Sequence, residues 1–275
     1  MDVRTQMRRA ARHYASLEAI EHGERRYTFA EAWGRGLRLA NALLALGLKP
    51  GDRVGVLEDN SIEAADLFAG AAAANLVRVP LYPRNGREAH RHMLGHTGCR
   101  ALVVSANHLA EVEGIDRELP DLAHIVVRGD DYENWLAGFP DTDPDVPVDE
   151  NDNFIIRHTG GTTGLGKGVA YTHRSWLCAG RDWFYSYPPV EPGDKALHLG
   201  PISHGSGYLF LPLWLSGGCN VMLDHFDVSA AAEIMEKEGI GYMFLVPTML
   251  NALNHEPTIR RRDFSKMKCM LVAAA

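Results

Sequence analysis

The chain has 275 residues, of which 46% are hydrophobic and 23% are charged, enough for a sizeable core in one or two compact units. Its formal net charge is −7, which argues against a general nucleic-acid-binding surface. The four cysteines form no Cys-x-x-Cys pair. The sequence therefore predicts neither a zinc site nor a disulfide framework, and it favours a reduced, cytoplasmic compartment.

Two other features could suggest a metal or a membrane. Thirteen histidines form no His-Glu-x-x-His pattern, and we expect His90 and His92 to lie on a solvated helix face. The alanine-rich run 64–80 is interrupted by Asp66, Asn75 and Arg78, so it is too short to span a bilayer. We expect it to form a buried helix that leads into a strand, and we expect no transmembrane segment.

Helices and strands alternate in the first half of the chain. Thr28 and Glu31 have the spacing of a capping box at the start of a helix. The expected elements are, in order, helix 32–47, strand 53–58, helix 62–74, strand 76–82, helix 86–97, strand 101–105 and strand 124–128. Short, unbroken apolar strands of this kind are typical of parallel sheets whose two faces are covered by helices.

The acidic, proline-rich segment 129–150 interrupts the alternation, and we expect it to be a surface connection anchored by Trp135, Leu136 and Phe139. It separates a first α/β subdomain, residues 1–150, from a second one, residues 151–275. The expected elements of the second subdomain are strands 154–159 and 168–172, helix 173–186, strand 195–200, helix 207–216, strand 219–224, helix 228–239, strand 242–246, helix 247–256 and strand 269–272. Because the chain stops directly after a strand, we expect it to be part of a longer protein.

A glycine- and threonine-rich loop between the first two strands of the second subdomain suits a polyphosphate. Its glycines let backbone N–H groups approach an anion, its threonines add hydroxyl donors, and Lys167 adds a positive charge. The candidate nucleotide-binding residues are Thr159, Gly160, Gly161, Thr162, Thr163, Gly164 and Lys167. A merely flexible hairpin would explain the glycines but not the other side chains.

The loop also approximates a P-loop, since Gly161 and Gly166-Lys167 have the required spacing. A P-loop, however, needs Ser or Thr after the lysine to hold Mg²⁺, and a helix must begin there. Gly168 follows the lysine, and the next residues are expected to form a strand. Both the chemistry and the context disfavour a P-loop NTPase.

The loop resembles that of the adenylate-forming superfamily, which includes acyl-CoA synthetases, amino-acid adenylation domains and firefly-type luciferases. That loop reads roughly Thr-Ser-Gly-Thr-Thr-Gly-x-Pro-Lys-Gly-Val, and the order of elements is similar along nearly the whole chain. Gly160 replaces the usual Ser and Gly166 the usual Pro. We expect both glycines to make the unbound loop more flexible and to raise the ordering cost of binding ATP.

The resemblance implies a layered αβαβα-type N-terminal domain with mostly parallel sheets and helices on both faces, incomplete at its C-terminus. It implies that a carboxylate attacks ATP to form an acyl-adenylate, and that CoA then displaces AMP. The implied cofactors and co-substrates are ATP/AMP, Mg²⁺ and CoA. The main Mg²⁺ ligand, the ribose-binding Asp and the C-terminal lid domain with its catalytic Lys are expected beyond residue 275. We therefore expect the chain alone to be poorly active, and no metal-ligand residue is assigned within it.

Three further segments resemble substrate- and adenine-binding parts of the same superfamily. In "PISHGSGYLF", His204 would be the catalytic residue between the acyl carboxylate and the thiol channel, and Gly205, Ser206 and Gly207 would make room for the acyl group. In "LVPTML", Val246 and Thr248 would line the acyl pocket, with a core role as the alternative. Ala273 and Ala274 would lie against the adenine, or simply end a strand.

The class of acid is narrowed by one residue. Amino-acid adenylation domains use an Asp in an "FDxS" element to hold the substrate amine, but Asp227 is displaced from that place and is expected to be a helix N-cap. This favours a fatty or aryl acid over an amino acid. A non-catalytic nucleotide- or acyl-binding module of the same fold is the alternative to a ligase, and a homodimer is an option for its assembly.

Overall fold

The computed structural model describes residues 1–159 and 166–273. The chain divides into two compact units that are discontinuous in sequence. Unit 1 comprises residues 1–6, 33–58 and 63–178, and unit 2 comprises residues 7–32, 59–62 and 179–275. Helices α1 (Val3–His13), α2 (Phe29–Ala45) and α7 (His173–Ser186) contribute residues to both units.

Unit 1 is built on a six-stranded sheet with the order β6-β5-β3-β4-β7-β8. All neighbours in it are parallel except β7 and β8, which form an antiparallel hairpin. Its strands are β3 (Arg53–Leu57), β4 (Val77–Pro80), β5 (Cys99–Ser105), β6 (His124–Arg128), β7 (Asn153–His158) and β8 (Gly168–Thr172).

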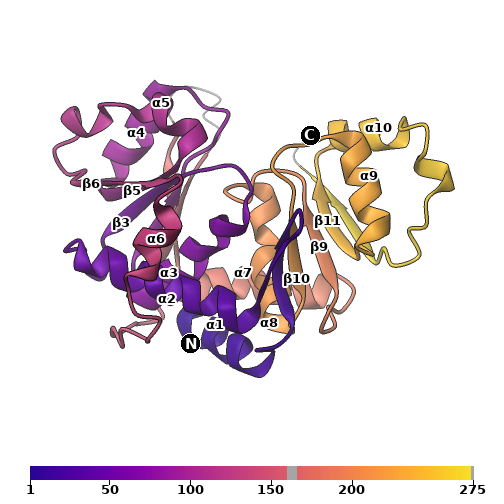
Figure 1. The fold of residues 1–275 in the computed structure, drawn as a ribbon, viewed down its shortest axis with the longest axis horizontal. Helices are drawn as coiled ribbons and strands as arrows, with labels where there is room; N and C mark the ends of the chain where they lie inside the picture. Colours follow the sequence, from indigo (N-terminus) through magenta and orange to yellow (C-terminus); the bar gives the residue numbers. More distant parts are fainter. Residues whose placement is uncertain (160–165, 274–275) are drawn as a thin grey trace. The chain divides into compact units, whose positions relative to one another are not determined.

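Helices pack on this sheet (Figure 1). The strands' apolar side chains pack against Met93 and Leu94 of α4 (Arg87–Thr97) and Val112 of α5 (Leu109–Val112). Helix α3 (Asp66–Ala74) is buried along its whole length, as its alanine-rich sequence predicts. A Cβ atom at Gly36 of α2 would lie 2.3 Å from the Cβ of Ala69, so the glycine is needed for α2 and α3 to pack this closely.

Unit 2 contains the other sheet, ordered β12-β11-β9-β10-β1-β2, in which only β1 and β2 are antiparallel. Its strands are β1 (Glu18–His22), β2 (Arg25–Thr28), β9 (Lys195–His198), β10 (Cys219–Met222), β11 (Tyr242–Leu245) and β12 (Cys269–Val272). Two separate apolar clusters pack on it. One contains side chains of α9 (Val228–Lys237) and α10 (Pro247–Asn254), and the other contains side chains of α7 and α8 (Phe210–Ser216).

These two mostly parallel, helix-covered sheets confirm the predicted fold class. Local signals in the sequence also place three helix starts. The backbone N–H of Thr28 donates to Glu31 Oε2 at 2.8 Å, while Glu31 N–H donates to Thr28 Oγ1 at 3.3 Å. Asp227 caps α9 by accepting a hydrogen bond from Ala230 N at 2.8 Å, and Pro247 stands in the first turn of α10.

Some expectations differ from the structure. Helix α1 and strands β1 and β2 were not predicted, and the connection 129–150 contains a short helix, α6 (Tyr132–Ala137). The expectation of a solvated His90 is wrong. Its side chain is fully buried, and its Nε2 lies 3.1 Å from the carbonyl oxygen of Tyr82. His90 is therefore a core residue, and its burial lowers the pKa of the imidazole.

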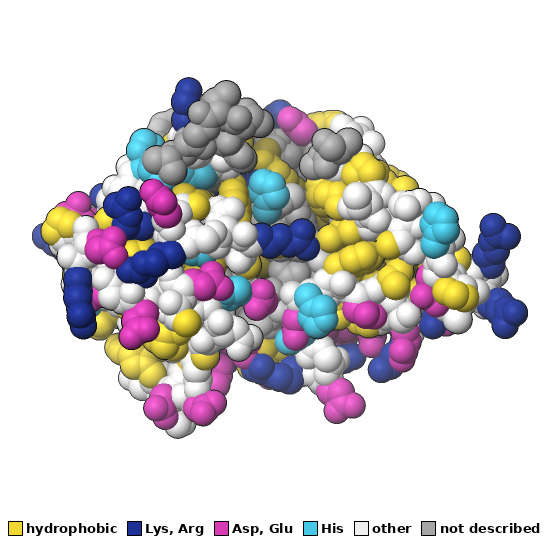
Figure 2. Space-filling view, turned by 90° about the horizontal axis from the view of Figure 1, so that it is seen from above, with side chains coloured by type: hydrophobic (Ala, Val, Ile, Leu, Met, Phe, Trp, Pro, Cys, Tyr) yellow, Lys and Arg dark blue, Asp and Glu magenta, His cyan; other side chains and the backbone are white. Residues whose placement is uncertain are grey.

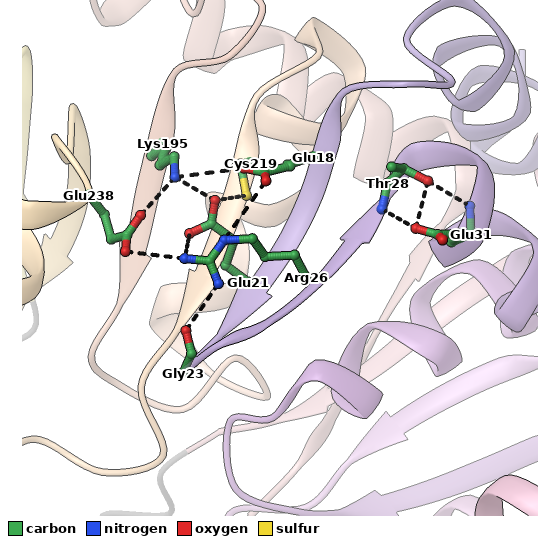
Figure 3. A network of polar contacts seen from close by, with 9 residues as sticks. All are labelled: Glu18, Glu21, Gly23, Arg26, Thr28, Glu31, Lys195, Cys219 and Glu238. Atoms are coloured by element: carbon green, nitrogen blue, oxygen red, sulfur yellow. Dashed lines mark hydrogen bonds and ion pairs between the residues drawn. The ribbon is translucent and has the colours of Figure 1, made fainter.

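An ionic network around the buried Glu21 links β1 to β9 and β2 in unit 2 (Figure 3). Glu21 is 1% exposed and pairs with Lys195, whose Nζ also lies 2.9 Å from Glu238 Oε2. Arg26 contacts both carboxylates, at 3.6 Å from Glu21 and 3.3 Å from Glu238. Cys219 also contacts Glu21, and Lys195 and Cys219 are the first residues of β9 and β10. Because ligands bind at the carboxyl ends of parallel strands, this network is structural.

Candidate functional site

The β7–β8 hairpin holds the ends of the glycine- and threonine-rich loop. Arg157 pairs with Val169 and His158 with Gly168, and the pairing continues one step beyond the strands. Thr159 N–H donates to the Lys167 carbonyl oxygen at 3.0 Å, and Lys167 N–H donates to Thr159 Oγ1 at 3.2 Å. We call residues 158–159 and 166–168 the loop stem. Its end presents the exposed side chains of Thr159 and Lys167.

Gly160, Gly161, Thr162, Thr163 and Gly164 lie outside the described residues, as does Ala274. Their assignment therefore stays a prediction. Gly166 is described, and its backbone packs closely against the other side of the stem. A Cβ atom at this position would lie 2.5 Å from the Thr159 carbonyl oxygen, closer than real Cβ contacts come. The absence of a side chain at Gly166 thus lets the two strands of the stem close tightly.

Three histidines surround the base of this stem. His92 and His96, one turn apart on α4, have stacked rings with centroids 5.3 Å apart, and His158 of β7 stands edge-on to both, at 6.3 and 6.0 Å. The Nε2 of His92 lies 3.0 Å from the carbonyl oxygen of Gly166. Burial, followed by the charges of His96 and His92, lowers the pKa of His158 to about 4, so His158 is neutral at physiological pH.

In unit 2, the other candidate residues follow the carboxyl ends of three neighbouring parallel strands. His204 follows β9, Val246 and Thr248 follow β11, and Ala273 follows β12. Ala273 N–H donates to the Leu245 carbonyl oxygen at 3.1 Å, so the ends of β11 and β12 are directly bonded. His204 and Thr248 are exposed, and Val246 is half-buried. This edge of a parallel sheet is where α/β proteins bind ligands.

Asn60 fixes the segment between β9 and His204. Its buried amide nitrogen lies 3.0 Å from the carbonyl oxygen of His198, 2.9 Å from that of Gly200 and 3.1 Å from that of Leu223, while its Oδ1 accepts from Ile202 N–H at 2.8 Å. A single side chain therefore contacts four backbone groups, at the ends of β9 and β10 and in the loop that follows β9. The backbone that leads to His204 is held in one conformation.

A buried polar chain supports the short 3₁₀ helix Gly205–Tyr208, which follows His204. His198 Nε2 lies 2.9 Å from Asn220 Oδ1, and its Nδ1 lies 2.9 Å from Ser206 Oγ. Because the Asn220 oxygen only accepts, Nε2 carries the proton, and Nδ1 accepts from the Ser206 hydroxyl. All three side chains are at most 1% exposed. Burial lowers the pKa of His198 to about 4, which keeps the ring neutral.

The two glycines of this motif allow close packing. A Cβ atom at Gly205 would lie 2.7 Å from the ring of Phe244 in β11, and one at Gly207 would lie 2.0 Å from the Ile202 carbonyl oxygen. The Ser206 hydroxyl points inward to His198. Gly205, Ser206 and Gly207 therefore position the turn after His204, and the structure gives each of them a packing partner within unit 2.

Neither a metal site nor a membrane span is found in the part of the chain that the structure describes. No group of three His, Cys, Asp or Glu residues within 1–159 and 166–273 is placed to hold a metal ion. No helix among those residues is both long and apolar enough to cross a membrane. On the face drawn in Figure 2, acidic and basic side chains are interspersed, and neither forms a large patch of one charge.

Comparison with known proteins identifies the family. Residues 7–275 match the family described as AMP-binding enzyme.

The chain belongs to this family of AMP-binding enzymes.

The curated relatives of this AMP-binding chain include a feruloyl-CoA synthase from Amycolatopsis sp, which is 31% identical over 97% of the chain and 53% of its own length. The long-chain-fatty-acid–CoA ligase FadD13 of Mycobacterium tuberculosis is 27% identical over 91% of the chain and 50% of its own length. The chain thus spans about half the length of these relatives.

Solved structures show the same fold. An inhibitor-bound N-terminal domain of FACL13 from Mycobacterium tuberculosis superimposes with a TM-score of 0.94, at 25% identity, over 100% of the AMP-binding chain and 70% of the other. An anthranilate CoA ligase, AuaEII, in complex with anthranoyl-AMP gives a TM-score of 0.93 at 22% identity, covering 100% and 54%. The two-sheet architecture is therefore that of the N-terminal domains of adenylate-forming enzymes.

The sequence-based interpretation did not identify Asn60, His92, His158 or His198 as supports of the candidate site. Asn60 lies three residues beyond the end of β3, and His198 ends β9. A polar residue at the carboxyl end of an apolar strand was a usable signal for both of them. His92 carried no such signal, because its contact with Gly166 lies 74 residues away.

Proposed function

We propose that the chain forms the ATP- and acid-binding part of an AMP-forming carboxylic acid–CoA ligase. A carboxylate oxygen of the acid attacks the α-phosphorus of ATP, and the bond from that phosphorus to the pyrophosphate oxygen breaks, giving acyl-adenylate and pyrophosphate. The thiol of CoA then attacks the acyl carbon, losing its proton, and AMP leaves. The sum of the two steps is a thioester, AMP and pyrophosphate.

The single observation that carries this proposal is the loop stem in a chain of the AMP-binding family. Thr159 N–H donates to the Lys167 carbonyl oxygen and Lys167 N–H donates to Thr159 Oγ1, so the exposed ammonium and hydroxyl stand at the end of a closed hairpin. This donor set suits the β- and γ-phosphates of ATP. In our proposal the leaving pyrophosphate is held by Lys167, Thr159, Thr162 and Thr163. These residues stabilise the negative charge that develops on it.

The carboxyl ends of β9, β11 and β12 form the proposed acid and adenine side. His204 extends from a backbone that Asn60 and the His198–Ser206 pair fix, so its imidazole can orient the carboxylate or the incoming thiol. Val246 and Thr248 would line the acyl pocket, and Ala273 would pack against the adenine. When a ligase joins two bound substrates, its main catalytic contribution is to hold their reacting groups in the correct orientation.

Mg²⁺ would neutralise phosphate charge when it is bound. No three ligating side chains converge among the described residues, and we assign no Mg²⁺ ligand within them. We therefore derive no step from the metal in this chain.

The acid is proposed to be a fatty acid, with an aryl acid as the alternative. Asp227 is engaged as the N-cap of α9, so it is not free to hold a substrate amine, which supports a non-amino acid substrate. The test is ligation of CoA by the natural full-length protein with a panel of fatty, cinnamic-type and amino acids. Thioester formed from fatty acids alone, with AMP in equal amount, is expected. If thioester forms only from aryl acids, the substrate is an aryl acid and not a fatty acid. Adenylation of amino acids would overturn both proposals.

A non-catalytic binding module is the other candidate function. It predicts that ATP binds to the natural full-length protein while no acid yields AMP. Formation of AMP and thioester in equal amounts would exclude a non-catalytic module.

A further inference from the structure

The stem of the glycine- and threonine-rich loop is held from outside the hairpin by a side chain of α4. His92 Nε2 lies 3.0 Å from the carbonyl oxygen of Gly166, the residue before Lys167. Because a carbonyl oxygen can only accept, the imidazole must donate through Nε2. The contact joins residues that are 74 positions apart.

The helix that carries His92 is fixed in the core of unit 1. Its next two residues, Met93 and Leu94, are 3% and 1% exposed and pack among the apolar side chains of β3, β4 and β5. The rings of His96 and His158 both contact the His92 ring, His96 stacked at 5.3 Å and His158 edge-on at 6.3 Å. The donor therefore stands on a rigid element in a restricted orientation.

Gly166 is the matching half of this contact. The stem approaches so closely that a Cβ atom at Gly166 would lie 2.5 Å from the Thr159 carbonyl oxygen. A side chain there would push the two sides of the stem apart and move the Gly166 carbonyl oxygen away from His92. The close stem and the histidine contact thus depend on the same residue.

Two other roles for the histidine cluster fit less well. No three ligating residues within the described part of the chain are placed to hold a metal ion, which argues against a tris-histidine metal site. His158 is 3% exposed, and neither of its ring nitrogens has a hydrogen-bond partner within the residues described. A neutral, buried imidazole of this kind serves as a packing surface for His92 rather than as a charged ligand for phosphate.

We propose that His92 is a positioning residue for nucleotide binding, and that its hydrogen bond to Gly166 holds Lys167 in place at the end of the stem. This inference rests on the proposed function, since the nucleotide is the ligand that Lys167 would meet. It assigns to α4 a part in ATP binding, and it makes Gly166 a residue that helps to order the loop rather than to loosen it.

The test compares His92→Phe, which keeps a ring but removes the donor, with His92→Gln, whose amide can still donate. ATP binding to the chain is measured by calorimetry, and KM for ATP and for the acid is measured with the full-length protein. His92→Phe should weaken ATP binding about three- to tenfold, as the loss of one hydrogen bond predicts, and should raise KM for ATP but not for the acid. His92→Gln should bind ATP within about twofold of the wild type.

His96→Phe is the matched control, because His96 is an exposed residue on the same helix and phenylalanine keeps a ring that can stack on His92. It should leave ATP binding unchanged. Wild-type affinity in His92→Phe, or equal weakening in His92→Phe and His96→Phe, would overturn the proposal. So would a rise in the KM for the acid that matches the rise for ATP, because that pattern indicates general loss of structure.

Amide hydrogen exchange separates this inference from the proposed function. Without any ligand, the Thr159 and Lys167 amides should exchange slowly in the wild type and in His92→Gln, and faster in His92→Phe. If the wild type binds no ATP, the proposed function fails, and the exchange rates still decide whether His92 fixes the stem. Equal exchange in all three proteins would refute that role.

Discussion

His198 accepts a hydrogen bond from the hydroxyl of Ser206 at 2.9 Å, and both side chains are buried beneath the turn that follows His204. The pair joins the end of β9 to the 3₁₀ helix Gly205–Tyr208. The candidate acid-binding edge of unit 2 is thereby attached to the core of its own sheet through a neutral polar contact.

Replacing Ser206 by Ala should lower the free energy of unfolding by about 1–3 kcal/mol, because His198 Nδ1 would be left buried without a donor. Urea denaturation of the purified chain measures the change. Ser229→Ala is the control, since Ser229 contacts Glu256 at the surface, and it should change stability by less than about 0.5 kcal/mol. Equal effects of the two substitutions would contradict the buried role of Ser206.

The buried His198 should make stability depend on pH. Its pKa in the folded chain is about 4, below the ordinary value of 6.5. Between these two pH values His198 is protonated in the unfolded chain but neutral in the folded chain. The free energy of unfolding is therefore unaffected above pH 6.5 and falls as the pH drops towards 4. Between pH 7 and pH 5 the wild type should lose about 2 kcal/mol more than His198→Phe, which cannot titrate. Parallel losses in the two proteins would show that His198 titrates normally.

Removing Lys195 should lower the free energy of unfolding, because the buried Glu21 carboxylate would lose its main partner. Burial already raises the pKa of Glu21, and Lys195 is the contact that most lowers it again. Lys195→Met should destabilise the chain by about 3–5 kcal/mol, and adding Glu21→Gln should recover part of the loss. Lys268→Met removes a more exposed pair with Asp194 and should cost less than about 1 kcal/mol. A double variant less stable than Lys195→Met would contradict this account.

Substitution of Gly166 tests the close stem directly. Gly166→Ala should weaken ATP binding at least as much as His92→Phe does, because its Cβ would clash with the Thr159 carbonyl oxygen. Gly34→Ala is the control, since a Cβ there would have its nearest neighbour at 3.8 Å, an ordinary contact. Calorimetric titration of both variants with ATP provides the comparison. Unchanged or tighter binding by Gly166→Ala would show that the stem tolerates a side chain.

The sequence predicted those features that depend on neighbouring residues. The Thr28–Glu31 capping box and the Asp227 cap each involve residues three positions apart, and the apolar strands are visible as short runs. The phosphate-binding loop was assigned because its residue types and their order follow a known pattern, and that assignment stays a prediction. Such signals are local, so tertiary structure does not alter them.

The supporting contacts could not be predicted, because their partners are distant along the chain. Asn60 bonds to Ile202 across 142 positions, and His92 bonds to Gly166 across 74. His90 and His92 look alike in sequence, yet one is buried in the core and the other faces the stem. The close approach of the Thr159 carbonyl oxygen to Gly166 was likewise invisible in the sequence, because only the folded hairpin brings the two together.

Acid-dependent exchange of labelled pyrophosphate into ATP tests the central claim most directly. The account predicts that the natural full-length protein catalyses this exchange only when a carboxylic acid is present, and that Lys167→Ala reduces it by at least tenfold with little change in folding. Exchange that persists in Lys167→Ala, or ATP hydrolysis that needs no acid, would contradict an acyl-adenylating loop at residues 159–167.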